Sequence, residues 1–433
     1  MKAGELFATG LDLEFIDPTH VFDADNSAVR IARKALSVLM MGWPQGGCGD
    51  LVSWRVIKAI FFSRDDALLS TIRRLFEEGF RHVFAQLNRQ SLSPAALQQA
   101  QFYISNCLSL WVCFDVKAHE SMALPQYIQG RWAWVHYRVV PIPLTEPTHR
   151  RPVFAYGLEP VNCPLAEPHL IFMGTNPLSD GFLTQIHTDL EAFETAGKQL
   201  YRTGHARLVA WLDKQPKKVH VCGMSLGGSL ALLLAMDQGQ KLSRVDAMNP
   251  AGLYDPFRKS RYDHWDSMVD KPAVYIQKQG NDPVSSFGVW KKEWHVLHVT
   301  PPADKQGPYG VMDHALNYAG FSNTRFVGVD TCEDNKEHQL RTILLYVAVR
   351  SFVYYCFVLP ASYVIHPVLD YVFEHKTAVG LMLALVVLFP YVPLVLSCVL
   401  FSVALGLTAY SLFETLDQPV ESSSTLAAQM KSF

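Results

Sequence analysis

The spacing of apolar residues along the first quarter of the chain is that of helices. Residues 28–41 and 65–87 carry apolar side chains at intervals of three and four, the period of one helix face. Ser93 and Pro94 predict the start of a third helix, because serine caps helix N-termini and proline is favoured in the first turn. We therefore expect residues 1–129 to form a mostly helical N-terminal module that packs on, or caps, the part that follows.

From about residue 130 the period changes to two, and short apolar runs alternate with stretches of helical spacing. The predicted strands cover residues 131–143, 152–161, 169–173, 245–248, 272–277, 294–299 and 324–329, and the predicted helices cover residues 181–196 and 200–214. The first two strands predict a hairpin. Strands that alternate with helices are typical of an α/β fold with a mainly parallel sheet, which we expect over residues 130–340.

The last hundred residues are strongly apolar. Residues 351–369 and 377–413 carry no formal charge, and about 20 apolar residues are enough for a helix to cross a bilayer. We therefore predict a transmembrane hairpin region over residues 341–415, in contact with the bilayer through residues 351–413, and a polar tail over residues 416–433. A pair of apolar helices buried inside the fold is the alternative.

Composition and charge exclude some partners. The formal net charge of the 433-residue chain is -2 and no basic stripe is present, so we expect no nucleic-acid partner. The 8 cysteines are scattered without Cys-x-x-Cys spacing, which favours buried thiols over a disulfide framework. The first residues lack a basic region followed by an apolar run, so we expect a multi-pass membrane protein without a cleavable signal peptide.

The most informative stretch is residues 219–230, with the sequence VHVCGMSLGGSL. Ser225 lies alone between Gly223 and Gly227, after an apolar strand pattern and before an apolar helix pattern that begins at Leu226. This Gly-x-Ser-x-Gly spacing is typical of a nucleophile elbow, in which a serine occupies a strained turn between strand and helix. The glycines avoid collisions with neighbouring backbone. A glycine-rich turn that packs a helix on a sheet is the alternative.

A serine hydroxyl is a weak nucleophile at neutral pH and needs a general base that a carboxylate orients. In doubly wound hydrolases the acid follows the serine in the chain, and the histidine comes last. Asp282 directly follows a predicted strand in a Gly-Asn-Asp-Pro turn, where turn amides can fix a carboxylate. Asp246 lies inside a predicted strand and Asp270 precedes one, so we expect Asp282 to be the acid. An ordinary Asn-Asp turn is the alternative.

The base and the oxyanion donors complete the expected chemistry. His314 follows a loop rich in glycine and proline, and loop-borne histidines suit proton transfer. We expect it to be the base, with His298, in a predicted strand, as the second candidate. The oxyanion of an acyl-transfer intermediate needs two donors. The backbone N–H of Leu226 is one, and Thr175, at the end of a predicted strand, is the natural second.

An ordered set of segments carries a family resemblance. The segments are Phe172-Met173-Gly174-Thr175-Asn176, Gly223-Met224-Ser225-Leu226-Gly227-Gly228, Asn249-Pro250, Asn281-Asp282-Pro283-Val284, and His314 with Tyr318. Over about residues 130–330 the chain resembles the class 3 (fungal-type) lipases. Two departures are Met173, where the family has arginine, and Met224, where it has histidine.

The resemblance implies an α/β-hydrolase fold and esterase or lipase activity on acyl esters. It implies a triad of Ser225, Asp282 and His314, with Thr175 and Leu226 as oxyanion donors, and no metal or organic cofactor. Beside its own bilayer, such an enzyme would act on a glycerolipid, phospholipid or similar acyl ester. In the family a short amphipathic lid follows the Gly-Thr strand, and here residues 179–190 lie in that place, with Phe182, Leu183 and Ile186 at helical spacing.

Two other functions stay open at this point. One is a membrane-anchored interaction protein on a catalytically degenerate hydrolase scaffold, with the N-terminal helices as its binding surface. The other is a thioesterase or amidase that uses the same triad.

Overall fold

The computed structural model describes residues 2–16, 27–41, 66–114, 121–147, 149, 152–176, 181–190, 194–254, 263–306, 310–330, 345–360, 363, 371 and 375. Its contacts divide the chain into two compact units, Met1–Phe352 and Val353–Phe433. The first unit holds the sheet and every predicted site residue. Most of the predicted transmembrane hairpin and the whole polar tail lie outside the described residues.

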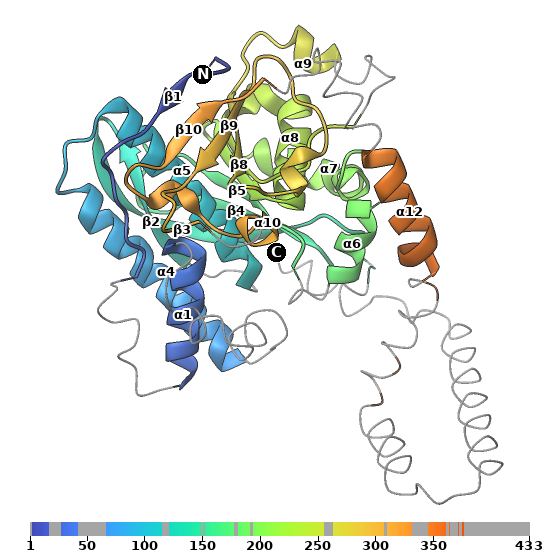
Figure 1. The fold of residues 1–433 in the computed structure, drawn as a ribbon, viewed down its shortest axis with the longest axis horizontal. Coiled ribbons are helices and arrows are strands. Elements are labelled where there is room, and N and C mark those ends of the chain that lie inside the picture. Colours follow the sequence, from blue (N-terminus) through green and yellow to red (C-terminus); the bar gives the residue numbers. More distant parts are fainter. Residues whose placement is uncertain are drawn as a thin grey trace, which may run out of the picture. The chain divides into compact units, whose positions relative to one another are not determined.

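A 10-stranded mixed sheet forms the centre of the first unit (Figure 1). The strands are β1 (Leu6–Phe7), β2 (Ser121–Ile128), β3 (Arg131–Pro143), β4 (Phe154–Pro160), β5 (His169–Phe172), β6 (Val219–Met224), β7 (Leu242–Met248), β8 (Ala273–Gln279), β9 (His295–Thr300) and β10 (Arg325–Gly328). Their order in space is β1-β10-β9-β8-β7-β6-β5-β4-β3-β2. The pairs from β5 to β9 are parallel, and the flanking pairs are antiparallel. The expected parallel arrangement therefore holds for the centre of the sheet.

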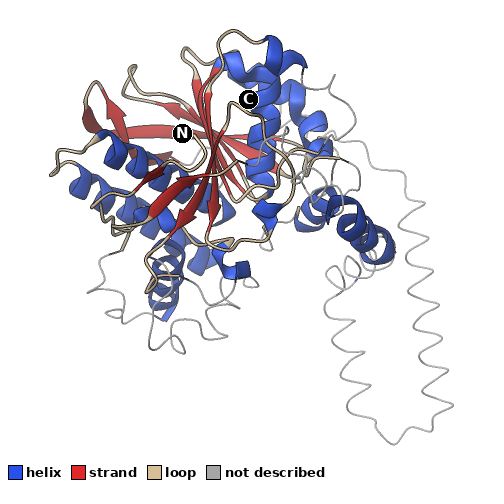
Figure 2. Cartoon of the chain, turned by 45° about the horizontal axis from the view of Figure 1, so that its top comes forward, coloured by secondary structure: helices blue, strands red, loops and turns tan. Residues whose placement is uncertain are grey.

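Helices cover both faces of this sheet (Figure 2). The α-helices that the structure describes are α1 (Ser27–Met41), α4 (Asp66–Leu87), α5 (Pro94–Trp111), α6 (Phe182–Leu190), α7 (Lys198–Leu212), α8 (Leu226–Gln238), α9 (Asp263–Ser267), α10 (Gly310–Asp313) and α12 (Ser351–Val353). Shorter 3-10 turns are η2 (Val112–Phe114), η3 (Gly239–Lys241), η5 (Val284–Ser286) and η6 (Tyr318–Gly320), and η7 (Leu345–Arg350) and η8 (Tyr354–Val358) are π-helical. The structure thus has an α/β architecture.

Alternate side chains of β6 enter two hydrophobic cores. Val219 and Val221 pack with α7 and α8, whereas Cys222 and Met224 pack with the core that α1, α4 and α5 share. A strand that is buried on both faces in this way needs apolar residues at successive positions. Helices α4 and α5 therefore pack directly on strands of the sheet, and α1 packs on α4. The predicted N-terminal module and the limits of the predicted domains stay predictions.

Strand β2 was not expected from the sequence, although the three N-terminal helices were. It contains Pro125, which has no backbone N–H to donate to a neighbouring strand and is therefore disfavoured in an inner strand. The sheet accommodates it because β2 is an edge strand that pairs only with β3. The two strands are joined by Gln129 and Gly130, both with positive φ (51° and 82°), and this two-residue turn makes the pair antiparallel.

The C-terminal region is helical from Leu345 to Val358. Within the residues that the structure describes, no helix has both the length and the apolar character that crossing a bilayer requires. The hairpin over residues 341–415 stays a prediction.

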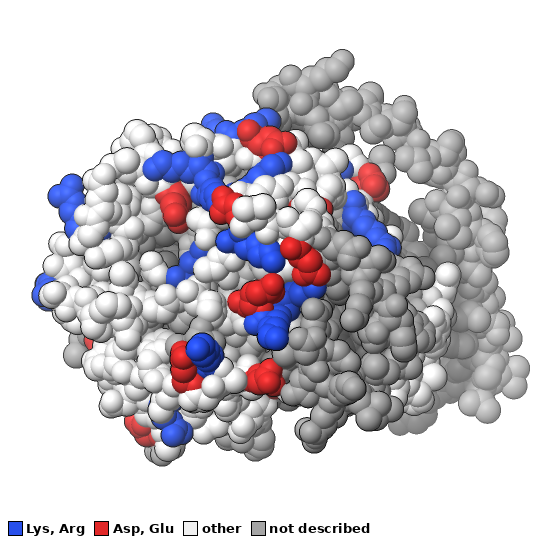
Figure 3. All heavy atoms as spheres, turned by 90° about the horizontal axis from the view of Figure 1, so that it is seen from above, with Lys and Arg blue, Asp and Glu red and all other residues white. Residues whose placement is uncertain are grey.

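Charges of both signs lie next to each other on the surface. On the face in Figure 3, Lys and Arg side chains are interspersed with Asp and Glu. Exposed ion pairs such as Lys241–Asp213 and Lys271–Glu293 illustrate this pattern. Such pairs contribute little to stability, typically about 0–1 kcal/mol each.

Candidate functional site

Ser225 lies on the turn between β6 and α8. Its φ and ψ are 55° and -124°, a combination that is sterically disfavoured for residues other than glycine. The backbone N–H of Ser225 donates to Met248 O at 2.9 Å. The turn also needs Gly227, because a Cβ atom there would lie only 2.2 Å from the carbonyl oxygen of Phe172. This strained strand-to-helix turn has the geometry that a nucleophile elbow requires.

Asp282 and His314, predicted as acid and base, lie in contact. His314 Nδ1 is 2.8 Å from Asp282 Oδ1, and the two side chains are 21% and 0% exposed. The carboxylate also accepts the backbone N–H groups of Val284 at 3.2 Å and Ser285 at 2.8 Å. Because the carboxylate acts as acceptor, the proton of the neutral imidazole is on Nδ1, and Nε2 is left to accept a proton. A general base needs this tautomer.

The end of β7 lies between Ser225 and His314. Met248 O accepts the Ser225 N–H, and the next residue, Asn249, donates from Nδ2 to His314 O at 2.9 Å. No hydrogen bond joins Ser225 Oγ to His314 Nε2 among the described residues. In the absence of substrate such bonds are often long, and they tighten in the complex.

The predicted oxyanion donors, Leu226 and Thr175, belong to segments that meet at the turn of Ser225. Leu226 is the first residue of α8, so its N–H has no acceptor within the helix. The segment before Thr175 approaches the elbow closely, because a Cβ atom on Gly174 would lie 2.9 Å from Met224 O. The structure therefore brings the ends of β5 and β6 together at the serine.

Helix α6 is bonded to the segment that contains Thr175. The hydroxyl of Thr175 donates to Asp189 Oδ2, and the backbone N–H of Asn176 donates to Gln185 Oε1 at 2.8 Å. Both acceptors are on α6, within the stretch predicted to be a lid. The helix thereby fixes the orientation of Thr175 in this structure.

Asp189 is an unusual acid in this position. Burial raises the pKa of its carboxyl group to about 7, while the hydrogen bond from Thr175 and the nearby charges of Arg350 and His314 oppose the rise. Arg350 belongs to η7, and its Nη1 donates to Glu194 O at 2.8 Å. In addition to Asp282, the titratable carboxyl group of Asp189 therefore lies beside the predicted oxyanion site.

The other acids and bases considered from the sequence have different partners. His298 Nε2 lies 2.7 Å from the carbonyl oxygen of Gly280. Asp246 is buried in β7, where its carboxylate pairs with an arginine and a histidine. Asp270 forms an ion pair on the surface with a lysine. Among the described residues, none of these three forms a hydrogen bond or an ion pair with Ser225 or Thr175.

Asp189 and Asn249 are residues of the site that sequence reasoning did not assign. Asp189 is in an amphipathic stretch without a motif, and no spacing rule connects it to Thr175. The sequence placed Asn249 at the end of a predicted strand and in the Asn-Pro pair of the family resemblance, without assigning it a role. Its place after a predicted strand was the available signal, because an amide that is buried there must have partners.

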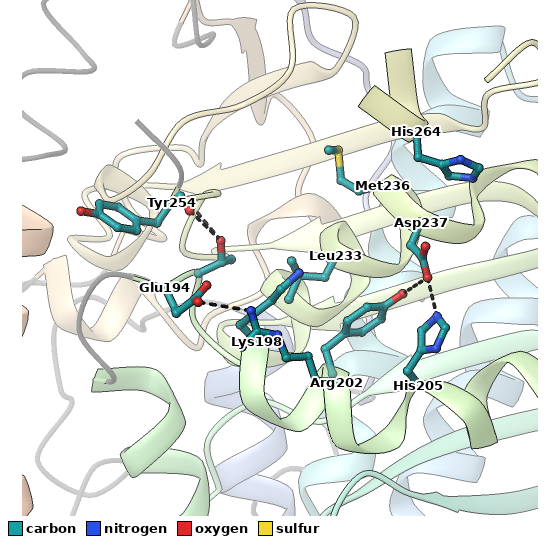
Figure 4. Close-up of a pocket in the computed structure, with 11 residues that line it drawn as sticks. Glu194, Lys198, Arg202, His205, Leu233, Met236, Asp237, Tyr254 and His264 are labelled. Atoms are coloured by element: carbon teal, nitrogen blue, oxygen red, sulfur yellow. Dashed lines mark hydrogen bonds and ion pairs between the residues drawn. The ribbon is translucent and has the colours of Figure 1, made fainter. Parts of the chain in front are cut away.

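A groove of about 330 Å³ lies along α7 and α8 (Figure 4). Within it Asp237 accepts the hydroxyl of Tyr201 at 2.7 Å, and His205 Nε2 lies 2.6 Å from the same carboxylate. Arg202 pairs with Glu194 across it. No predicted site residue lines this groove. Among the described residues, no group of three or more His, Cys, Asp or Glu side chains is placed to hold a metal ion.

No protein-family model matches the chain, and a search of curated proteins finds no match. The arguments for a function therefore come from the residues of this chain and their geometry.

Proposed function

We propose that the protein is a membrane-associated serine hydrolase of the α/β-hydrolase fold that cleaves acyl esters of lipids. One observation carries the proposal: Asp282 and His314 form a hydrogen-bonded pair whose backbone is tied, through Asn249, to the strained turn of Ser225. A structural role alone gives no reason for a serine with φ of 55° beside such a pair.

In the proposed reaction Ser225 Oγ attacks the ester carbonyl, and its proton moves to His314 Nε2. Asp282 holds the imidazole and stabilises the imidazolium that forms. The oxyanion is held by the N–H of Leu226 and by the N–H and hydroxyl of Thr175. Collapse of the intermediate releases the alcohol, which takes the proton from His314. Water, activated by the same ring, then hydrolyses the acyl-enzyme.

The proposed substrate class follows from the C-terminal sequence. Residues 351–413 are apolar enough to associate with a bilayer, which would place the hydrolase beside glycerolipids or phospholipids. As part of this proposal, α6 acts as a lid. Its opening would break the bonds from Thr175 to Asp189 and from Asn176 to Gln185, so lid position and oxyanion geometry would change together.

The hydrolysis of p-nitrophenyl esters of increasing chain length tests this proposal. Replacing His314 with Gln should lower kcat about 10³-fold or more, since the base is lost. His298→Gln is the matched control, because His298 is a histidine that bonds to the carbonyl oxygen of Gly280, close to the turn that contains Asp282. This substitution should leave kcat within about twofold.

Three outcomes are distinguishable. Ester hydrolysis that depends on His314 supports the proposal. Faster cleavage of thioester or amide analogues would reassign the reaction to a thioesterase or amidase. A native protein that cleaves none of these compounds would favour an interaction protein on a hydrolase scaffold.

A further inference from the structure

Asn249 is buried in a strained conformation at the centre of the site. It follows β7, is 0% exposed and has φ of 46°. Asparagine tolerates the left-handed region better than most residues, but this conformation still has a cost that the surroundings must offset.

The side chain of Asn249 is bonded at every polar atom. Oδ1 accepts the backbone N–H of Gln279 at 2.7 Å, and Nδ2 donates to the carbonyl oxygens of Asp313 at 3.0 Å and His314 at 2.9 Å. These partners determine the orientation of the amide. In the flipped orientation the amide oxygen would face two carbonyl oxygens, and the NH₂ group would face the N–H of Gln279.

These bonds connect three chain segments that carry the proposed chemistry. The residue before Asn249 accepts the N–H of Ser225. Gln279 ends β8, three residues before Asp282. The third segment contains His314 itself. The Asn249 side chain therefore links the backbone segments of the acid and the base, and the backbone of the preceding residue, Met248, links them to the nucleophile.

We propose that Asn249 is a positioning residue. It holds the backbone of His314 so that the imidazole stays aligned with both Asp282 and Ser225. The inference rests on the proposed hydrolase function. Asn249 touches no reacting atom, and it acts through His314. A displacement of about 1 Å in such a group can lower a rate about 10²-fold.

Two variants separate the side chain from the backbone strain. Asn249→Gly keeps the positive φ without strain and removes the three side-chain bonds. Asn249→Asp keeps the acceptor for Gln279 but places an oxygen against the carbonyls of Asp313 and His314. Asn323→Gly is the control, because Asn323 also has positive φ (65°) and is exposed.

The rate at which a fluorophosphonate probe labels Ser225 is measured for each protein, per folded molecule, together with kcat and KM for an ester. Both Asn249 variants should label about 10- to 100-fold more slowly, with kcat reduced and KM within about twofold. Asn323→Gly should label at the native rate. In a His314→Ala background the Asn249→Gly change should have no further effect, because the group it positions is absent.

The outcomes distinguish this inference from the proposed function. If the native protein is not labelled at Ser225, the hydrolase proposal itself fails. If it is labelled and the Asn249 variants label at the native rate, only the positioning role is overturned. An effect that persists undiminished without His314, or loss of the fold in both variants, would show a structural role and would also overturn it.

Discussion

At Asp282, three donors converge on one carboxylate. Two are turn amides, those of Val284 and Ser285, and the third is the ring of His314. The sequence predicted the turn amides, because Asp282 follows a strand and precedes Pro283. It could rank His314 only by its loop, since the two residues are 32 positions apart and their contact depends on how β8 and α10 are placed.

Replacing Asp282 with Asn should lower kcat for ester hydrolysis about 10³- to 10⁴-fold, because an amide no longer favours the proton on His314 Nδ1. Asp270→Asn is the matched control, since Asp270 precedes β8 and Asp282 follows it. Kinetics with a soluble ester measure both variants. Equal activity of the Asp282 variant and the native protein would contradict the assignment of Asp282.

The raised pKa of Asp189 predicts a pH dependence at the proposed oxyanion site. Below its pKa of about 7, the protonated carboxyl group can donate to Thr175 and leaves the Thr175 hydroxyl to donate to an oxyanion. Above it, the carboxylate only accepts, and the hydroxyl is committed to it. The loss of activity in Thr175→Val should therefore be larger at pH 6 than at pH 8, by up to about tenfold.

The control for this prediction removes the titration. In Asp189→Asn the amide donates to Thr175 at every pH, so the effect of Thr175→Val should no longer vary between pH 6 and pH 8. The ratio of kcat/KM values with and without Thr175→Val is the measurement in both backgrounds. A ratio that stays constant with pH when Asp189 is present would contradict this role.

At the scale of elements, the site is formed where β5 ends against the start of α8. Helix α4 and strand β3 could be predicted closely, because their apolar period is regular over many residues, and the start of α5 could be predicted from Ser93 and Pro94. The described helix α6 covers Phe182–Leu190 of the predicted 181–196, and α10 ends at Asp313, so His314 directly follows a helix. The end of α10 depends on bonds from Asp313 and His314 to Asn281 and Asn249 that no local pattern encodes.

Replacing Gly227 with Ala should destabilise the protein by about 3 kcal/mol, although alanine favours helices. The added Cβ would collide with the carbonyl oxygen of Phe172 at 2.2 Å, and backbone atoms cannot turn away. Gly10→Ala is the control, because nothing lies within 4 Å of its Cβ position, and it should change stability by less than about 0.5 kcal/mol. Urea unfolding measures the stability of both variants. Equal stabilities of the two variants would contradict the close approach of Gly227 to Phe172.

At the scale of the whole molecule, a buried polar network joins α5 to the sheet. Ser105 donates to Asp246 at 2.7 Å, His220 lies 2.8 Å from the same carboxylate, and Arg244 pairs with it at 2.9 Å. Ser105 and Asp246 are 141 positions apart. The sequence showed apolar helices and strands but not which of them dock, because polar pairs at such a distance leave no periodic signal.

Asp246→Asn should lower the free energy of unfolding by about 3 kcal/mol at pH 7, since it leaves Arg244, whose side chain is only 13% exposed, without its counter-charge. Burial raises the pKa of Asp246, but the Arg244 charge and the bonds from His220 and Ser105 lower it below the ordinary value. The stabilisation is therefore full above about pH 4 and is lost as the pH falls below that. Urea unfolding at pH 7 and pH 3 should show a difference between the two proteins that shrinks with acid, and a constant difference would contradict it.

The central claim, that Ser225 is a nucleophile, is tested most directly by mapping the residue that a fluorophosphonate probe modifies. The full chain is incubated with the probe in detergent and digested, and the modified peptide is identified by mass spectrometry. The account predicts a single adduct on Ser225 that is absent from Ser225→Ala. No adduct, or an adduct that the substitution leaves in place, would contradict it.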